Sequence, residues 1–131
     1  MAKEVLGIEG SKTLTTRALE NAKYNQLDHK TQFQQSNLFE VSPDDVENWD
    51  RADKWLIDPP REGAMEVCKA LQSVSKEFLP KRIVYVSCNP KTLARDVAIL
   101  MHELSYQLNQ AGIINMFPHT SHIESIAVLT I

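Results

Sequence analysis

The spacing of apolar residues divides the chain into alternating strands and helices. Apolar runs predict six strands, at residues 4–9, 31–35, 55–57, 82–87, 106–116 and 125–131. Apolar residues three and four positions apart predict four helices, at residues 11–25, 43–49, 64–76 and 89–104. The run Ile83-Val84-Tyr85-Val86 is the clearest buried strand, because it is rich in β-branched residues and has no polar interruption.

This order of elements indicates the fold class. Strands that alternate with helices predict an α/β fold, with a mainly parallel sheet and helices on both of its faces. The last two strands have no helix between them, so we expect them to pair antiparallel at one edge. No repeat, linker or low-complexity segment divides the sequence. A single domain over residues 1–131 is therefore predicted.

Polar segments stand where ligands of such a sheet bind, at the carboxyl ends of its strands. Glu9-Gly10, Asp58-Pro59-Pro60-Arg61 and Ser87-Cys88-Asn89-Pro90 each follow a predicted strand. A fourth segment, residues 117–124, joins the two final strands. Candidate chemistry is expected in these four segments.

Composition and charge narrow the function classes. Hydrophobic residues make up 43% and charged residues 24% of the 131, as in an ordinary globular domain. The net charge of -3 lacks the basic excess of a stand-alone nucleic-acid-binding domain. If the protein acts on RNA, most of the contacts to the RNA phosphates are expected to come from residues outside this chain. No apolar run approaches the ~20 residues of a membrane span, so no membrane partner is expected, and the cytoplasm is the default location.

The two cysteines suggest chemistry rather than a structural bridge. They lie twenty residues apart and form neither a disulfide framework nor a zinc pattern. Cys88 lies where a strand meets a helix start, with Asn89 suited to the N-cap and Pro90 to the first turn. The free N–H groups of a helix N-terminus favour a thiolate, the nucleophilic form of cysteine. A small, inert cysteine at a strand end fits this position equally well, so position alone leaves both interpretations open.

The acidic residues at two other strand ends are weaker signals. Asp58-Pro59-Pro60-Arg61 is a stiff loop with few backbone donors. Amino-methyltransferases use a similar loop with an aromatic residue after the prolines, so Arg61 argues against methylation of an exocyclic amine. Glu9 ends an early strand, where an acid commonly binds ribose hydroxyls, although the glycine-rich turn that usually accompanies it would precede residue 1. A plain connection and a solvated turn remain the alternatives.

The loop between the final strands contains two histidines and a carboxylate. His119, His122 and Glu124 lie within six residues, but their spacing is not a standard zinc pattern and no third strong ligand site is evident. We therefore expect no metal. A carboxylate held in a loop over a sheet is instead suited to act as a general base.

Three segments together resemble the signatures of the RNA (uracil-5-)-methyltransferases. These are DPPREG at 58–63, IVYVSCNPKT at 83–92 and FPHTSHIE at 117–124. Three separated motifs in the right order are far more specific than any one alone, and the resemblance covers nearly the whole chain. Residues 92–96 and 122–125 are most similar to the branch that acts on large-subunit ribosomal RNA. A transfer-RNA enzyme of the same family is the alternative.

The resemblance implies a Rossmann-like, S-adenosylmethionine-dependent methyltransferase acting on C5 of a uridine in RNA. It assigns attack on C6 of the uracil to Cys88 and removal of the C5 proton to Glu124. It places Glu9 at the cofactor ribose, Asn37 near the adenine, and Asp58 between cofactor and target base. A non-catalytic Rossmann-like remnant that binds a partner is a second interpretation, from a different class.

The sequence also departs from the family pattern. Asn115 stands where the family usually has Asp, which keeps hydrogen bonding but loses a charge. The family's RNA-binding barrel, the iron–sulfur cysteines of its ribosomal branch, the first sheet strand and the glycine-rich cofactor loop do not precede Met1. The chain therefore resembles a C-terminal catalytic part, and without a central strand its sheet would have two unpaired edges. We expect abnormal pairing or a homodimer through these edges, and weak or no activity of the isolated chain.

Overall fold

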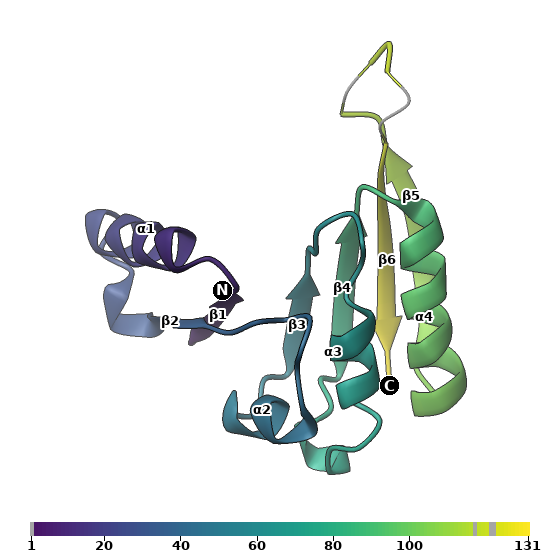
Figure 1. The fold of residues 1–131 in the computed structure, drawn as a ribbon, viewed down its shortest axis with the longest axis horizontal. Coiled ribbons are helices and arrows are strands. Elements are labelled where there is room, and N and C mark those ends of the chain that lie inside the picture. The colour runs from purple at the N-terminus through teal and green to yellow at the C-terminus, as the bar shows by residue number, and fades with distance from the viewer. Residues whose placement is uncertain (1, 117, 121–122) are drawn as a thin grey trace. The chain divides into compact units, whose positions relative to one another are not determined.

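The chain forms two compact units in the computed structural model, which describes residues 2–116, 118–120 and 123–131. The first unit is Met1–Val41 and the second is Ser42–Ile131. Each has its own sheet, as Figure 1 shows. The expectation of a single domain over residues 1–131 remains a hypothesis.

The first unit is one strand–helix–strand motif. Strand β1 (Val5–Glu9) leads through helix α1 (Lys12–Tyr24) and a 3-10 turn to strand β2 (Thr31–Gln35). Ser11 caps α1, accepting a hydrogen bond from the Leu14 amide at 3.4 Å. The two strands pair in parallel, with Glu9 opposite Gln35, so their carboxyl ends lie side by side.

The second unit is a four-stranded sheet with three α-helices. Its strands, in the order β3-β4-β6-β5, are β3 (Lys54–Ile57), β4 (Arg82–Ser87), β6 (Glu124–Thr130) and β5 (Gln107–Ile114). Its helices are α2 (Pro43–Asn48), α3 (Met65–Ala70) and α4 (Pro90–Leu104). β3 and β4 are parallel, whereas β6 is antiparallel to both of its neighbours. The predicted antiparallel pair at the C-terminal end is confirmed.

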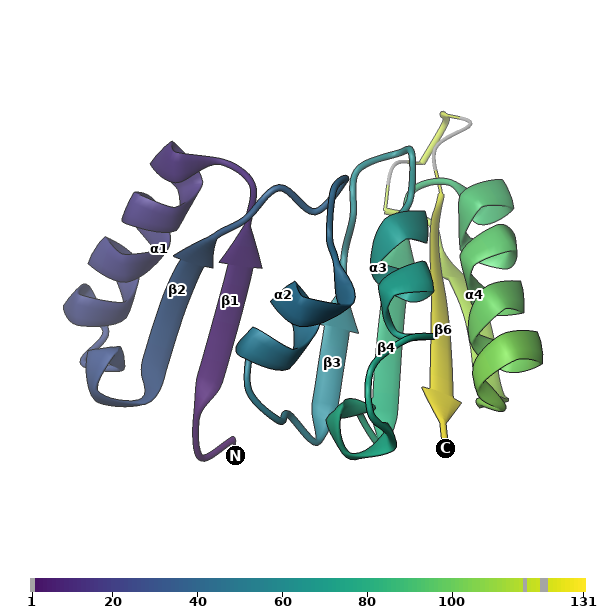
Figure 2. The ribbon, with the colours of Figure 1, turned by 60° about the horizontal axis from the view of Figure 1, so that its bottom comes forward.

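The core of the second unit lies between one face of its sheet and its helices, which Figure 2 shows gathered on the same side. Ile83, Tyr85 and Leu129 point to this side and are fully buried. On the opposite face, Leu56 is 72% exposed, and its register partner Val84 is half-buried. The prediction of helices on both faces is therefore wrong for this sheet, because its own helices cover only one of them.

The pairing of β1 and β3 and the length of α3 also bear on the predictions. A continuous sheet from β1 to β3 would contradict the expectation of two unpaired edges. The described part of the chain has no such sheet, because β1 and β3 belong to different sheets. Helix α3 ends at Ala70, not at residue 76 as predicted. The amides of Gln72 and Ser73 bond three residues back, to Lys69 and Ala70, and this tighter geometry ends the α-helix.

Candidate active site

Three of the predicted site residues meet at one end of the four-stranded sheet. Asp58 directly follows β3 and Cys88 directly follows β4, and because these strands are parallel both residues lie at the carboxyl edge. Glu124 begins β6, and the antiparallel register pairs the next residue, Ser125, with Ser87. Cys88 and Glu124 therefore lie one position beyond the last pair of the β4–β6 ladder, at the same end.

Cys88 occupies a short, firmly held bend between β4 and α4. It is half-buried and forms no disulfide. The Ser87 hydroxyl accepts a hydrogen bond from the Asn89 amide and donates one to the Asn89 carbonyl, both at 3.1 Å. Asn89 in turn caps α4, accepting from the Lys91 amide at 3.1 Å. The predicted N-cap and first-turn proline of this helix are confirmed, and they hold the thiol at the helix start.

The loop after β3 is attached to the first turns of α4. Pro59 and Pro60 have no N–H group, so the loop offers mainly carbonyls for docking. The Arg61 carbonyl accepts hydrogen bonds from Asn89 Nδ2 and Thr92 Oγ1, both at 3.2 Å. The carbonyl of the next residue accepts from Arg95 Nη2 at 2.9 Å. The helix that begins beside Cys88 therefore also holds the loop that carries Asp58.

A buried carboxylate completes this attachment. Asp96 is fully buried, and its Oδ2 accepts from the Tyr85 hydroxyl at 2.6 Å and from the Ala64 amide at 2.7 Å. Its Oδ1 accepts from Arg95 Nε at 2.8 Å. Burial, together with the hydrogen bond to Asp96, raises the pKa of Tyr85, and the hydrogen bond to Asp96 raises the pKa of Arg95.

Sequence reasoning missed this network, although a signal for it was present. In α4, Leu93, Val97 and Leu100 form the buried stripe, and Asp96 falls on the same face. A charged residue on the apolar face of a helix needs a partner. Here the partners come from β4 and from the loop after β3, which are distant in sequence.

The predicted cofactor residues of the first unit lie at the carboxyl ends of its two strands. Glu9 ends β1, and its carbonyl accepts from the Ser36 amide at 3.1 Å, which brings Asn37 to the same edge. Glu9 Oε1 accepts from the Ser11 amide at 2.8 Å, and Asn37 Oδ1 accepts from the Phe39 amide at 3.2 Å. A carboxylate and an amide at neighbouring strand ends can receive a nucleoside, the first at hydroxyls and the second at a base edge.

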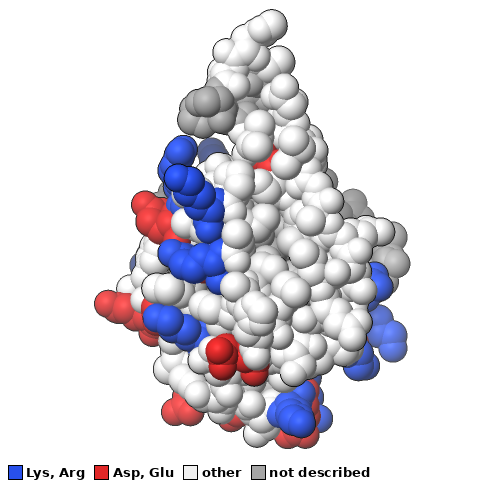
Figure 3. Space-filling view, turned by 90° about the vertical axis from the view of Figure 1, so that its right-hand side faces the viewer, with Lys and Arg blue, Asp and Glu red and all other residues white. Residues whose placement is uncertain are grey.

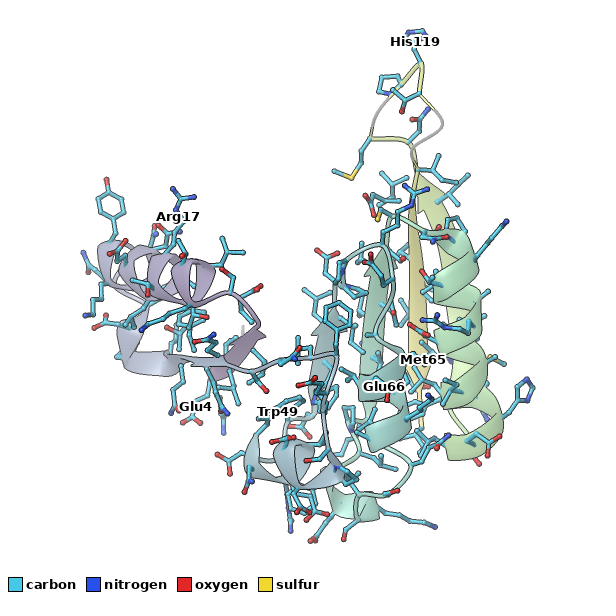
Figure 4. All side chains as sticks on the ribbon, viewed as in Figure 1. Glu4, Arg17, Trp49, Met65, Glu66 and His119 are labelled. Atoms are coloured by element: carbon cyan, nitrogen blue, oxygen red, sulfur yellow. The ribbon has the colours of Figure 1, made fainter. Side chains whose placement is uncertain are left out.

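The loop between the final strands contains two histidines, of which the structure describes His119. His119 lies at the tip of the segment between β5 and β6, where Figure 4 labels it, with a φ of 67°. His122 lies outside the described residues. In the part of the chain that the structure describes, no group of three His, Cys, Asp or Glu side chains is arranged to hold a metal ion. Asn115 lies in the exposed segment that follows β5.

Figure 3 shows a broad uncharged surface on the side formed by α4 and β5, with lysine and arginine at its left and right borders. Every residue of β5 is exposed. Among the described helices, none is long and apolar enough to cross a membrane.

Solved structures place this fold in a known class. The crystal structure of the Pyrococcus abyssi tRNA (uracil-54, C5)-methyltransferase, in complex with S-adenosyl-L-homocysteine, is 34% identical. It superposes with a TM-score of 0.75 over 97% of this chain and 29% of that one. M. capricolum TrmK, in complex with S-adenosyl-homocysteine, matches in fold at 15% identity, with a TM-score of 0.66 over 98% of this chain and 51% of that one. The fold is that of the Rossmann-like methyltransferases.

Sequence comparison identifies the family within this class. Residues 2–131 match the family model described as tRNA (Uracil-5-)-methyltransferase, and the chain belongs to this family. The 23S rRNA (uracil(1939)-C(5))-methyltransferase RlmD of Polynucleobacter necessarius is 60% identical over 97% of this chain and 27% of its own length. The RlmD of Ralstonia pickettii is 61% identical over 97% of this chain and 30% of its own length. The chain thus spans less than a third of the curated relatives it matches.

Proposed function

We propose that this chain supplies the catalytic residues for methylation of C5 of a uridine in large-subunit ribosomal RNA. The observation that carries the proposal is the meeting of Asp58, Cys88 and Glu124 at one end of the β3-β4-β6 sheet. The roughly 60% identity to RlmD relatives supports a ribosomal target.

In the proposed reaction, Cys88 acts as the nucleophile and Glu124 acts as the general base. Uracil C5 is a poor nucleophile until a thiolate adds to C6. The Cys88 thiolate forms a bond to C6, and the ring electrons move to C5. S-adenosylmethionine, when bound, would supply an electrophilic methyl group to C5 and leave as S-adenosyl-homocysteine. Glu124 then takes the proton from C5, and the bond between Cys88 and C6 breaks to restore the double bond and the thiolate.

Residues on both units suit the cofactor. Glu9 keeps one carboxylate oxygen beyond the one bonded to Ser11, and that oxygen is suited to ribose hydroxyls. Asn37 is exposed, and its side-chain amide is suited to the adenine edge. Asp58 is exposed at the edge where Cys88 lies, and we assign it the position between cofactor and target base. We further propose that residues 1–131 belong to one methyltransferase domain.

The decisive test is a covalent trap. We would build a hybrid protein in which this chain replaces its matched segment in the Ralstonia pickettii relative. The hybrid is mixed with S-adenosylmethionine and a ribosomal RNA fragment containing 5-fluorouridine. Fluorine cannot leave C5 as a proton, so the expected product is a stable link between Cys88 and the RNA, detected by mass spectrometry and lost in Cys88→Ala.

The control separates failure of binding from failure of chemistry. A Glu124→Gln hybrid keeps Cys88 and is expected to form the adduct with ordinary uridine as well, because the C5 proton is then removed slowly. Binding of cofactor and RNA without any adduct in the unsubstituted hybrid would make Cys88 structural. The non-catalytic interpretation would then replace the enzymatic one.

A transfer-RNA target is the second candidate, favoured by the 34% identity to the Pyrococcus abyssi enzyme. The same trap, run with equal amounts of a ribosomal and a transfer-RNA fragment, distinguishes the two. We expect the ribosomal fragment to be captured. Capture of the transfer RNA alone would reverse this assignment.

The setting of the reaction follows from the same proposal. Ribosomal RNA modification places the protein in the cytoplasm and makes RNA its partner. Because β1 and β3 each have one side without a hydrogen-bonded strand in their own sheets, we further propose that the isolated chain covers these edges by forming a homodimer and is weakly active or inactive.

A further inference from the structure

We propose that Arg95 and Asp96 are positioning residues, which hold the loop of residues 58–63 in register with Cys88. This inference rests on the proposed function and extends it to residues that do not touch the reacting atoms. The observation behind it is that one helix face both begins beside Cys88 and holds this loop.

The loop needs such a clamp because it has few means of holding itself. Its two prolines remove two N–H donors, and within it one turn bond joins the Gly63 amide to the Pro60 carbonyl at 2.9 Å. The other hydrogen bonds of the loop, and those of Ala64 directly after it, run to β4 and to α4 with its N-cap. The Arg61 and Glu62 carbonyls are held by side chains of α4, and the Ala64 amide is held by Asp96 and Tyr85.

Asp96 is the centre of the clamp. A fully buried carboxylate is costly unless strong donors satisfy it. Tyr85, Ala64 and Arg95 satisfy it from a strand, a loop and the adjacent helix position, at 2.6 to 2.8 Å. Arg95 links the two parts, since it bonds Asp96 through Nε and the Glu62 carbonyl through Nη2. Its side chain is 41% exposed, so it can be changed without opening the core.

Gly63 is matched to this clamp. Its φ of +84° is a left-handed conformation, and a Cβ at this position would lie 2.5 Å from Asp96 Oδ2 and 2.7 Å from Arg95 Nη2. The backbone therefore approaches the two charged groups more closely than any other residue would allow. The loop sequence and the helix sequence are complementary at this contact.

The consequence is a specific kinetic signature. Asp58 stands at one end of the clamped loop and Cys88 stands directly before the helix that clamps it. Loosening the loop should misalign the two without removing either. Small misplacements of reacting groups lower the rate of chemistry much more than they lower ground-state binding. A clamp therefore acts on kcat, whereas a residue that binds the cofactor acts on KM.

The test uses the hybrid protein, with Arg95→Met as the main variant and Thr92→Val as a second, milder one. Arg51→Met is the matched control, because Arg51 is also a partly exposed arginine in an ion pair, with Glu77. We expect kcat for methyl transfer to fall about tenfold or more in Arg95→Met, with the KM for S-adenosylmethionine unchanged within about twofold. Hydrogen exchange of residues 58–64 should be faster in the same variant, and unchanged in β4 and β6.

The outcomes separate the inference from the function on which it rests. An active unsubstituted hybrid with normal kcat in Arg95→Met would overturn the inference alone. So would an equal loss in Arg51→Met, a loss confined to KM, or a loss of kcat without faster exchange in the loop. An unsubstituted hybrid that binds cofactor and RNA but transfers no methyl group would overturn the proposed function, and this inference with it.

Discussion

Replacement of Gly63 by alanine should destabilise the second unit strongly. The left-handed φ of +84° costs a residue with a side chain about 1–2 kcal/mol. The new methyl group would lie 2.5 Å from Asp96 Oδ2, well inside normal contact, and must push the loop away from α4. That movement breaks the 2.7 Å bond from the Ala64 amide to a buried carboxylate, which adds about 1.5–3 kcal/mol.

The sum, about 2.5–5 kcal/mol, is a large part of the roughly 5–15 kcal/mol by which small domains are stable. Urea unfolding of the chain followed by tryptophan fluorescence measures it directly, because Trp49 and Trp55 both belong to the second unit. We expect the unfolding midpoint to fall by about 1 M or more.

Gly112→Ala provides the matched control in the same unit. Gly112 lies in β5 without a left-handed φ, and an added Cβ would meet Ile126 Cγ2 at 3.8 Å, an ordinary contact. Its free energy of unfolding should change by no more than about 0.5–1 kcal/mol, and in the stabilising direction. If Gly63→Ala cost no more than Gly112→Ala, the reasoning about the clamped loop would be refuted.

Three further predictions follow from buried groups and from the open sheet face. Burial raises the pKa of Cys68 from an ordinary 9.0 to about 12, so brief alkylation at pH 8 should label Cys88 and spare Cys68, as mass spectrometry would show. Because the folded pKa of Cys68 is the higher one, its contribution to stability is complete below about pH 9 and is lost as the pH rises toward 12. Alkaline unfolding should therefore be less steep in Cys68→Ala, and an unchanged slope would contradict this account. Tyr106→Phe removes the buried hydroxyl that donates to the Pro80 carbonyl at 2.6 Å and should cost about 1–3 kcal/mol in urea unfolding, whereas Tyr24→Phe, at an exposed position, should cost nothing measurable. In a monomeric chain, Leu56→Lys should change the free energy of unfolding by no more than about 0.5 kcal/mol, because this side chain is 72% exposed. A larger loss of stability, together with a smaller mass by light scattering, would show that the open face is covered in a dimer.

Local signals predicted most of the elements correctly. The strand at Arg82–Ser87, the N-cap at Asn89 and the antiparallel final strands all depend on residues close together in the chain. Hydrophobic period, capping residues and turn residues act over such short distances. The end of α3 was misjudged because helical spacing continues past Ala70, while the backbone there tightens into three-residue turns.

Part of the candidate site could be predicted from local sequence, and part could not. Cys88, Glu124 and Asp58 were predicted from motifs, and the sheet register brings these three residues to one edge. Their assigned roles, and those of Glu9 and Asn37, remain predictions for the trap experiment. The Asp96 network was not foreseen, because its donors come from β4, from α4 itself and from the loop after β3.

The sequence by itself determined the class of the fold, the order of its elements and the identity of the candidate nucleophile and base. These follow from periodicity and from motifs whose residues are neighbours along the chain. Only the tertiary structure decided which face of the sheet is covered, that β1 and β3 belong to separate sheets, and that α4 holds the loop beside Cys88. The physical reason is that burial and hydrogen-bond partners depend on which distant segments come together, and local sequence does not specify those partners.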